Sequence, residues 1–166
     1  VVVAAHNRGK FIQRALRSVV DQTIFRHSAG QHPMVEVTIV DDESTDDTKN
    51  TVKKFIDRHK NPAINWFYCS HSQNLGVTNP KNAGIDVALA EWVVFLDPED
   101  MWEPHHLEHY QGAIMGNPSV DLFYSTPVVL GNREIPNQGT TKIDDTLDNT
   151  LDVCVRREVA LKHKFK

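Results

Sequence analysis

Three carboxylates, Asp97, Glu99 and Asp100, follow a strongly apolar run within four residues. Crowded negative charges cost free energy unless a cation neutralises them. Carboxylate oxygens suit Mg²⁺ or Mn²⁺, which commonly take one or two protein carboxylates together with substrate phosphates. The pattern therefore predicts a metal and diphosphate site, stiffened by Pro98, which fixes its own φ and disfavours α geometry at Asp97. A solvated acidic turn that caps the following helix is the alternative.

A second acidic cluster begins with Asp41 and Asp42, at the end of a run of β-branched residues. Ser44 or Thr45 can cap a helix whose first turn holds Asp46–Asp47, a position that the helix dipole favours. Capping does not explain Asp41 and Asp42. Carboxylates at a strand end can accept hydrogen bonds from a base or from ribose hydroxyls. We interpret both residues as ligand-binding.

The elements that position these clusters alternate between apolar runs and helical periodicity. The expected strands are residues 1–5, 35–40, 64–69 and 92–96. The expected helices begin after Asn7 as N-cap, after Ser44 or Thr45, and near residue 81, the last of these running to about residue 90. This βαβαβαβ order predicts an α/β fold with a mostly parallel sheet covered by helices. Ligands bind such sheets outside the carboxyl ends of the strands, where both acidic clusters lie.

The second half of the chain has weaker signals. Pro104 suits the first turn of another helix. The remaining expectations are a strand at 120–124, a hairpin at 128–135, a polar loop at 136–149 and a last strand at 151–155. With 166 residues, 40% of them hydrophobic, the chain is sized for one domain.

Composition excludes several classes of protein. A net charge of −4 lacks the positive field of a nucleic-acid binder. Cys69 and Cys154 lie far apart, so we read them as buried, reduced thiols of a cytosolic protein. No apolar run approaches the roughly 20 residues that cross a bilayer.

Two sets of side chains, three histidines and the basic residues at the end of the chain, each have a structural explanation as well as a functional one. His105, His106 and His109 have a spacing on one helix that can chelate zinc, but no further ligand follows at set spacing, so we interpret them as binding nothing. The chain ends with basic residues that suit either an anionic membrane surface or solvent. These are Arg156, Arg157, Lys162, Lys164 and Lys166.

Four motifs in order resemble a known family. Val3–Arg8 resembles the "P-T-Y-N-R" opening of family-2 glycosyltransferases, and Val40–Thr48 resembles their "V-D-D-G-S-T-D-D-T". Asn74–Val77 with Lys81–Ile85 resembles "N-x-G-x…R-N-x-G-I", and Phe95–Trp102 resembles "F-L-D-x-D-D-x-W". Each motif alone is weak, but their shared order and spacing make the resemblance specific.

The resemblance implies a GT-A fold, a Rossmann-like sheet, and inverting transfer from a nucleotide-diphosphate sugar, expected to be a UDP-sugar, to an acceptor hydroxyl. It implies Mn²⁺ or Mg²⁺ as cofactor, and cell-surface polysaccharide biosynthesis. The implied nucleotide-sugar-binding residues are Ala4, His6, Asn7, Asp41, Asp42, Lys81, Asp97 and Pro98. The implied metal ligands are Asp97 and Glu99. In this assignment Ala4 and His6 line the base pocket, and Asp42 binds the base.

This sequence departs from the family pattern at several positions. Ala4 and Ala5 replace Pro and Thr, and His6 replaces Tyr, although an imidazole can still stack on a base. Glu99 replaces the second Asp of D-x-D and so adds one methylene. The departures at Ala4, Ala5 and Glu99 favour the rival hypothesis of a non-catalytic module that keeps the fold. The retained Asp42, Lys81 and Asp97 favour the enzyme. A nucleotidyltransferase ranks last, because it needs a Gly-rich loop where only Gly9 is present.

The family's catalytic base is an Asp well downstream of the metal motif, and no catalytic residue is assigned here. The late acidic residues suit a solvated loop; they are Asp144, Asp145, Asp148 and Asp152. We therefore expect one catalytic-domain fragment, with residues 1–107 binding the donor and 108–166 beginning a truncated acceptor part. This chain should bind donor without transferring sugar. The acceptor is an unassigned glycan, lipid or protein, and the expected location is cytoplasmic, at the inner face of a membrane.

Overall fold

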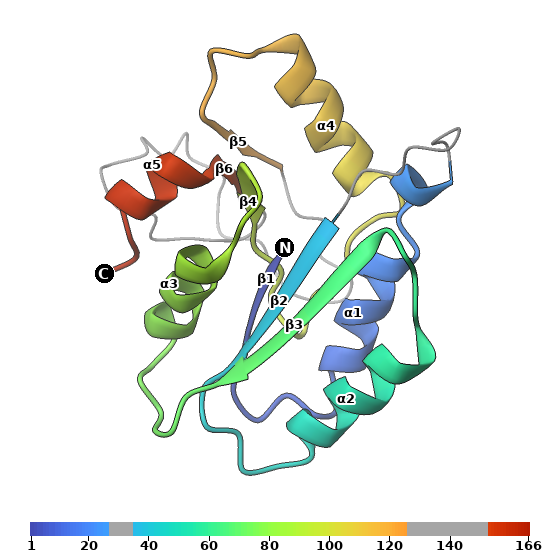
Figure 1. The fold of residues 1–166 in the computed structure, drawn as a ribbon, viewed down its shortest axis with the longest axis vertical. Coiled ribbons are helices and arrows are strands. Elements are labelled where there is room, and N and C mark those ends of the chain that lie inside the picture. The colour runs from blue at the N-terminus through green and yellow to red at the C-terminus, as the bar shows by residue number, and fades with distance from the viewer. Residues whose placement is uncertain (27–34, 126–152) are drawn as a thin grey trace, which may run out of the picture.

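The structure is a computed structural model that describes residues 1–26, 35–125 and 153–166 (Figure 1). The strands are β1 (Val2–Ala5), β2 (Val35–Asp41), β3 (Ile64–Ser70), β4 (Trp92–Val94), β5 (Leu122–Tyr124) and β6 (Val153–Arg156). The helices are α1 (Ile12–Val20), α2 (Thr48–Arg58), α3 (Thr78–Val87), α4 (His106–Gly116) and α5 (Arg157–Lys162), with a 3-10 turn, η1 (Thr23–Phe25). The α/β class predicted from the sequence is confirmed.

The strands form two three-stranded sheets that meet at β1. In the first, β1, β2 and β3 are parallel, in the order in which they occur in the chain. In the second, β6 lies between β4 and β5 and is antiparallel to both. A parallel bridge between Val2 and Phe95 joins the two sheets, and the Leu96 N–H donates to the Val2 carbonyl at 3.0 Å. The parallel arrangement therefore holds around the candidate site, whereas the late strands break it.

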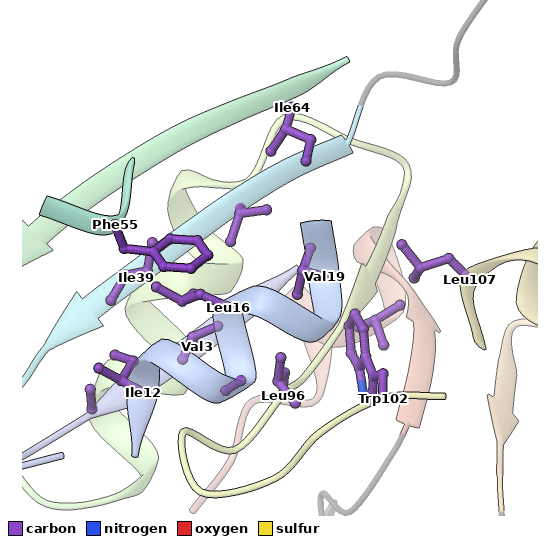
Figure 2. Packing of buried hydrophobic residues seen from close by; sticks show 14 of the residues in the cluster. Val3, Ile12, Leu16, Val19, Ile39, Phe55, Ile64, Leu96, Trp102 and Leu107 are labelled. Carbon is purple, nitrogen blue, oxygen red and sulfur yellow. The ribbon is translucent and has the colours of Figure 1, made fainter. Parts of the chain in front are cut away.

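Helices cover both faces of the parallel sheet (Figure 1), with α1 and α2 on one side and α3 on the other. Successive side chains of a strand point to opposite faces. Val3 and Ile39 accordingly pack with Leu16 of α1 and Phe55 of α2, as Figure 2 shows. Val2 belongs to the cluster on the other face, together with Ile85, Phe95 and Phe165. Both faces are thus buried, which fixes the register of the strands that lead to the site.

Helix α3 approaches β1 without an intervening side chain at Gly84. A Cβ built on Gly84 would lie 2.3 Å from Cγ1 of Val2, closer than real atoms come. The glycine of the third family motif, in Lys81–Ile85, is therefore a packing residue. It lets α3 lie against the sheet and so fixes the position of Lys81, one turn earlier.

Three predicted helix starts are corrected. Helix α1 begins at Ile12 with Phe11 as N-cap, not after Asn7. Helix α2 begins at Thr48, so the acidic pair expected in its first turn precedes it, and neither Ser44 nor Thr45 is the N-cap. Helix α3 begins at Thr78, three residues before the expected start, and ends at Val87.

One burial prediction was wrong, and two predicted elements lie outside the described residues. Cys69, predicted to be buried, is exposed on β3, whereas Cys154 is buried as predicted, and no disulfide joins them. The predicted hairpin at 128–135 and loop at 136–149 lie outside the described residues. In the described ranges, no helix has the length and apolar character that crossing a membrane requires.

Candidate functional site

Four predicted site residues lie at or just beyond the carboxyl ends of neighbouring parallel segments. Ala4 pairs with Val40 within the sheet, and His6 follows the last residue of β1. Asp42 follows β2, and Asp97 comes two residues after the bridge at Phe95. The sheet therefore brings together residues that are more than ninety positions apart in sequence, at the edge where such folds bind ligands.

Lys81 and Asp97 form an ion pair at this edge. Nζ of Lys81 lies 3.1 Å from Oδ1 of Asp97, and the two side chains are 8% and 29% exposed. A lysine is rarely buried this deeply without a counter-charge. Removing one partner of such a pair leaves the other charge poorly compensated. Two residues assigned to the nucleotide sugar are thus in direct contact.

The second carboxylate of the acidic turn, Glu99, is half exposed and also faces a cation. Its Oε2 accepts a hydrogen bond from Nε of Arg8 at 3.0 Å. Its main-chain carbonyl accepts one from Arg14 at 2.9 Å. Pro98, between the two acidic residues, is buried. Arg8 was not among the predicted site residues, although it stands in the first family motif, and that was the available signal.

Asp42 is 2% exposed, and its carboxylate organises the loop between β3 and α3. Its oxygens accept hydrogen bonds from the main-chain N–H groups of Leu75, at 3.0 and 3.1 Å, and Gly76, at 3.0 Å. Oδ1 also lies 2.6 Å from Nδ1 of His71, which donates because a carboxylate only accepts. Sequence reasoning missed His71, because nothing in its local pattern marks it. The predicted contact between Asp42 and the base stays a prediction.

Asp41 is equally buried and is engaged within the fold. Oδ1 accepts from the Ser44 N–H at 2.8 Å, and Oδ2 accepts from the Tyr68 hydroxyl at 2.5 Å. Burial and this hydrogen bond raise the pKa of Tyr68 well above its usual value. The two carboxylate oxygens of Asp41 therefore have structural partners, which favours a supporting role over direct contact with a ligand.

The hydrogen bonds around His6 define its tautomer. Nδ1 lies 2.7 Å from the Asp42 carbonyl, which can only accept, so Nδ1 carries the proton. Nε2 lies 3.1 Å from Nδ2 of Asn7 and 3.2 Å from Nδ2 of Asn74. The amide oxygens of both asparagines accept main-chain N–H groups, so their nitrogens face His6 as donors. These contacts hold the imidazole in one orientation beside Asp42.

Asn7 connects the loops that follow β1 and β2. It has a positive φ of 52°, a conformation that asparagine tolerates better than most residues. Its N–H donates to Oγ of Ser44 at 2.8 Å, and its Oδ1 accepts from the Thr45 and Asp46 N–H groups at 2.8 and 3.2 Å. Asn7 and Ser44 therefore do not cap the helices that follow them, because the side chain of each binds the main chain of the other's loop.

Asp46 contributes to the same junction. Its carboxylate accepts the N–H groups of Thr48 at 2.9 Å and Gly9 at 3.1 Å. Desolvation opposes the charge, but hydrogen bonds from Thr48 and Gly9 outweigh it and hold the pKa of Asp46 below its usual value. Asp46, rather than Ser44 or Thr45, thus accepts the first N–H of α2, whereas the N-cap residue, Asp47, makes no side-chain capping bond.

Glu43 occupies a strained position in this junction. Its φ is 59°, which costs a residue other than glycine about 1–2 kcal/mol. Its Oε2 accepts the Asn74 N–H at 2.8 Å. The resembled family has glycine at this position, which adopts a positive φ without strain. Glu43 is strained there, but its side chain forms a hydrogen bond with the loop that Asp42 organises.

The strain gives a prediction. Glu43→Gly and Glu43→Ala both lose the contact with Asn74, but only alanine keeps the cost of the left-handed conformation. We expect Glu43→Gly to be more stable than Glu43→Ala by about 1 kcal/mol in urea unfolding. Equal stability of the two variants would contradict the strain.

The α4 histidines have structural partners. His106 stacks on Trp102, with ring centroids 4.6 Å apart, and His105 Nδ1 lies 2.9 Å from Oε2 of Glu108. Across the described part of the chain, no group of three or more His, Cys, Asp or Glu side chains is arranged to hold a metal ion. The structure thus offers no support for zinc at these histidines.

Much of the basic cluster is engaged within the molecule. Arg156 contacts Asp121 and Glu91 and lies over the ring of Trp92, at 4.6 Å. Arg157 donates to main-chain carbonyls at the end of α3, and Lys164 pairs with Asp86. The four late aspartates considered as base candidates lie outside the described residues.

The comparison with protein families decides the classification of this site. The model of glycosyl transferase family 2 matches residues 1–157. The chain belongs to that family. The match covers all the residues that the strand ends bring together, so the resemblance inferred from four motifs is confirmed.

Individual relatives and solved structures agree with the family match. The chain is 30% identical over 160 residues to the poly(ribitol-phosphate) beta-N-acetylglucosaminyltransferase TarP of Staphylococcus aureus, covering 91% of this chain and 44% of TarP. The fold matches S. aureus TarS (1–349) in complex with UDP-GlcNAc, with a TM-score of 0.76 and 23% identity, over 97% of this chain and 46% of that one. This likeness shows the GT-A fold.

A more distant structural neighbour is the mannosyltransferase PcManGT from Pyrobaculum calidifontis, solved with GDP-Man and Mn²⁺. It has a TM-score of 0.61 and 22% identity, over 73% of this chain and 33% of that one. The chain spans about half the length of the curated relatives that it matches.

The donor atoms of the acidic turn fit a divalent ion. Mg²⁺ and Mn²⁺ prefer carboxylate oxygens, and one or two carboxylates suffice when phosphates complete the coordination. Asp97 and Glu99 supply two, each now facing a protein cation. An ion bound here must therefore compete with Lys81 or Arg8, unless a bound anion draws those cations away.

Proposed function

We propose that this chain is the donor-binding part of a glycosyltransferase that uses a UDP-sugar and transfers the sugar with inversion to an acceptor hydroxyl, with Mn²⁺ or Mg²⁺. The observation that carries the proposal is the ion pair between buried Lys81 and partly exposed Asp97, in the same turn as Glu99, at the carboxyl ends of the parallel strands. TarP is named as an N-acetylglucosaminyltransferase, and TarS was solved with UDP-GlcNAc. Both support a uridine nucleotide.

Each residue has a distinct part in this proposal. Ala4 and His6 line the base pocket, and the fixed imidazole offers a flat face for the base. Asp42 holds the loop at the pocket edge and accepts a hydrogen bond from the nucleoside. Asp97 and Glu99 hold the metal, with Pro98 stiffening the turn. When bound, the ion neutralises charge that develops on the departing diphosphate.

Lys81 complements this arrangement. In the structure its ammonium group neutralises Asp97. With diphosphate present, the same group lies near enough to the turn to share its charge between Asp97 and the anion. A lysine acts as a point charge on phosphates, so the exchange needs no strict geometry. The proposed acceptor is a cell-surface glycan, lipid or protein reached from the cytoplasmic side of the membrane.

The proposal predicts metal-dependent binding. Calorimetry of this chain with uridine diphosphate should give at least about tenfold tighter binding with Mn²⁺ than with chelator, since about 1.4 kcal/mol or more is lost when diphosphate faces two unscreened carboxylates. Uridine, which has no diphosphate, should bind equally in both conditions. Guanosine diphosphate should bind more weakly than uridine diphosphate.

Two results would contradict the proposal. Equal affinity for uridine diphosphate with and without chelator would remove the metal from the site. Equal affinity for the uridine and guanosine nucleotides would remove the base specificity. Failure of all three ligands to bind the folded chain would favour the non-catalytic module.

A further inference from the structure

Arg8 links the loop after β1 to the acidic turn through the side chain of Glu99. The two groups come from positions 91 residues apart in sequence, and Nε lies 3.0 Å from Oε2. Their side chains are 39% and 50% exposed. An exposed pair of this kind stabilises a fold by about 0.2–1 kcal/mol, so stability alone is a weak reason for its presence.

The guanidinium of Arg8 is also fixed from its other side. Nη1 donates to the His6 carbonyl at 3.0 Å and to the Asn7 carbonyl at 3.4 Å. The main-chain N–H of Arg8 donates to Oγ1 of Thr48 at 2.9 Å, next to the start of α2. If the carboxylate of Glu99 moved, these contacts would still hold the guanidinium at the rim of the site.

A divalent ion on Glu99 and the guanidinium of Arg8 compete for one carboxylate. Two cations about 3 Å apart repel strongly unless an anion lies between them. The diphosphate of a donor is such an anion, and guanidinium groups bind phosphate oxygens in a planar, bidentate manner. Arrival of metal and donor together would therefore replace the Arg8–Glu99 contact with two better-matched contacts.

We propose that Arg8 is a diphosphate-binding residue that neutralises Glu99 in the donor-free protein and releases it to the metal when donor binds. This inference rests on the proposed function of the same site. It explains why the acidic turn can stay folded without an ion, because each of its two proposed metal ligands has an internal counter-charge, Lys81 for Asp97 and Arg8 for Glu99. It also predicts opposite effects of one substitution on two ligands.

The test measures Mn²⁺ and uridine diphosphate separately on Arg8→Gln. Free Mn²⁺ is followed by electron paramagnetic resonance without nucleotide, and the variant should bind it up to about fivefold more tightly, equivalent to about 1 kcal/mol for a lost exposed pair. Calorimetry at saturating Mn²⁺ should show uridine diphosphate binding about tenfold more weakly, since a charge-assisted hydrogen bond is lost.

Arg17→Gln is the matched control. It removes the same charge from α1 but breaks a contact with Asp21, away from the acidic turn. Both affinities of this variant should stay within about twofold of the original, because Arg17 contacts Asp21 and His59 rather than a carboxylate of the acidic turn. Equal changes in the two variants would assign the effect to net charge and overturn the inference.

The remaining outcomes distinguish failure of this inference from failure of the proposed function. Unchanged or weaker Mn²⁺ binding by Arg8→Gln would show that Arg8 does not compete for Glu99, and the inference would fail. Unchanged binding of uridine diphosphate by that variant would also overturn it. Failure of the original chain to bind uridine diphosphate would instead overturn the proposed function.

Discussion

Replacing Gly84 with alanine is expected to lower the free energy of unfolding by about 3 kcal/mol, the upper part of the range for overpacking a well-packed core. The new Cβ would lie 2.3 Å from Cγ1 and 3.0 Å from Cγ2 of Val2. Val2 is 2% exposed and β-branched, so its side chain has no free rotamer to adopt. Helix α3 must therefore move away from β1, and chemical denaturation measures the cost.

Gly112→Ala is the control for this substitution. Gly112 lies inside α4, and a Cβ there meets nothing within 4 Å. Alanine is the better helix former by about 1 kcal/mol, so this variant should gain stability by up to that amount. If Gly84→Ala were also stabilised, the close approach of α3 to β1 would be wrong.

The displacement of α3 has a consequence for the site. Lys81 lies on the same helix, one turn before Gly84, and contacts Asp97 at 3.1 Å. A shift of the helix by a few tenths of an ångström changes this distance. We therefore expect residual folded Gly84→Ala to bind uridine diphosphate less tightly, which links a packing residue to the proposed ligand contacts.

The sequence predicted the elements whose signals are local. The apolar runs that become β1 to β4 end within two residues of the expected positions, because β-branched and aromatic residues bounded by polar turns are a local signal of a strand. The position of β6 between β4 and β5 was not predictable in this way. Its residues pair with β4, about sixty residues earlier in the chain, and with β5, about thirty residues earlier, and no periodicity within Val153–Arg156 encodes a partner or a direction.

The same distinction holds at the candidate site. Asp42, Lys81 and Asp97 were found because their positions in family motifs are local signals. The contacts that define their chemistry are not local. His71 on Asp42 and Arg8 on Glu99 are contacts between different loops, and they exist only once the sheet has brought the strand ends together.

Asn7 shows why the helix starts were misplaced. Asparagine before an apolar stripe is a good N-cap signal, and its side chain does bind main-chain N–H groups. Those groups belong to Thr45 and Asp46 in the next loop, not to α1. The residue type was informative about its hydrogen bonding, whereas its partner depended on the tertiary fold.

Asp42→Ala is expected to have the largest effect of the substitutions considered, lowering the free energy of unfolding by about 3–5 kcal/mol, because several donors lose their acceptor and each unsatisfied buried donor costs about 1–3 kcal/mol. It removes the acceptor of the His71 ring and of the Leu75 and Gly76 main-chain N–H groups. Asp42→Asn keeps one oxygen acceptor but turns an amide donor toward these groups, so it should be destabilised by less.

Binding distinguishes the two roles assigned to Asp42. If its carboxylate both shapes the loop and accepts a hydrogen bond from the nucleoside, Asp42→Asn should bind uridine about tenfold more weakly at a temperature where it is fully folded, since such a charge-assisted bond contributes about 1.5–3 kcal/mol. His71→Ala disturbs the same loop from its other side and leaves the carboxylate in place. It should lose stability with a smaller loss of uridine affinity. Equal losses of affinity in the two variants would mean that Asp42 acts through the loop alone, and unchanged affinity in Asp42→Asn would exclude the nucleoside contact.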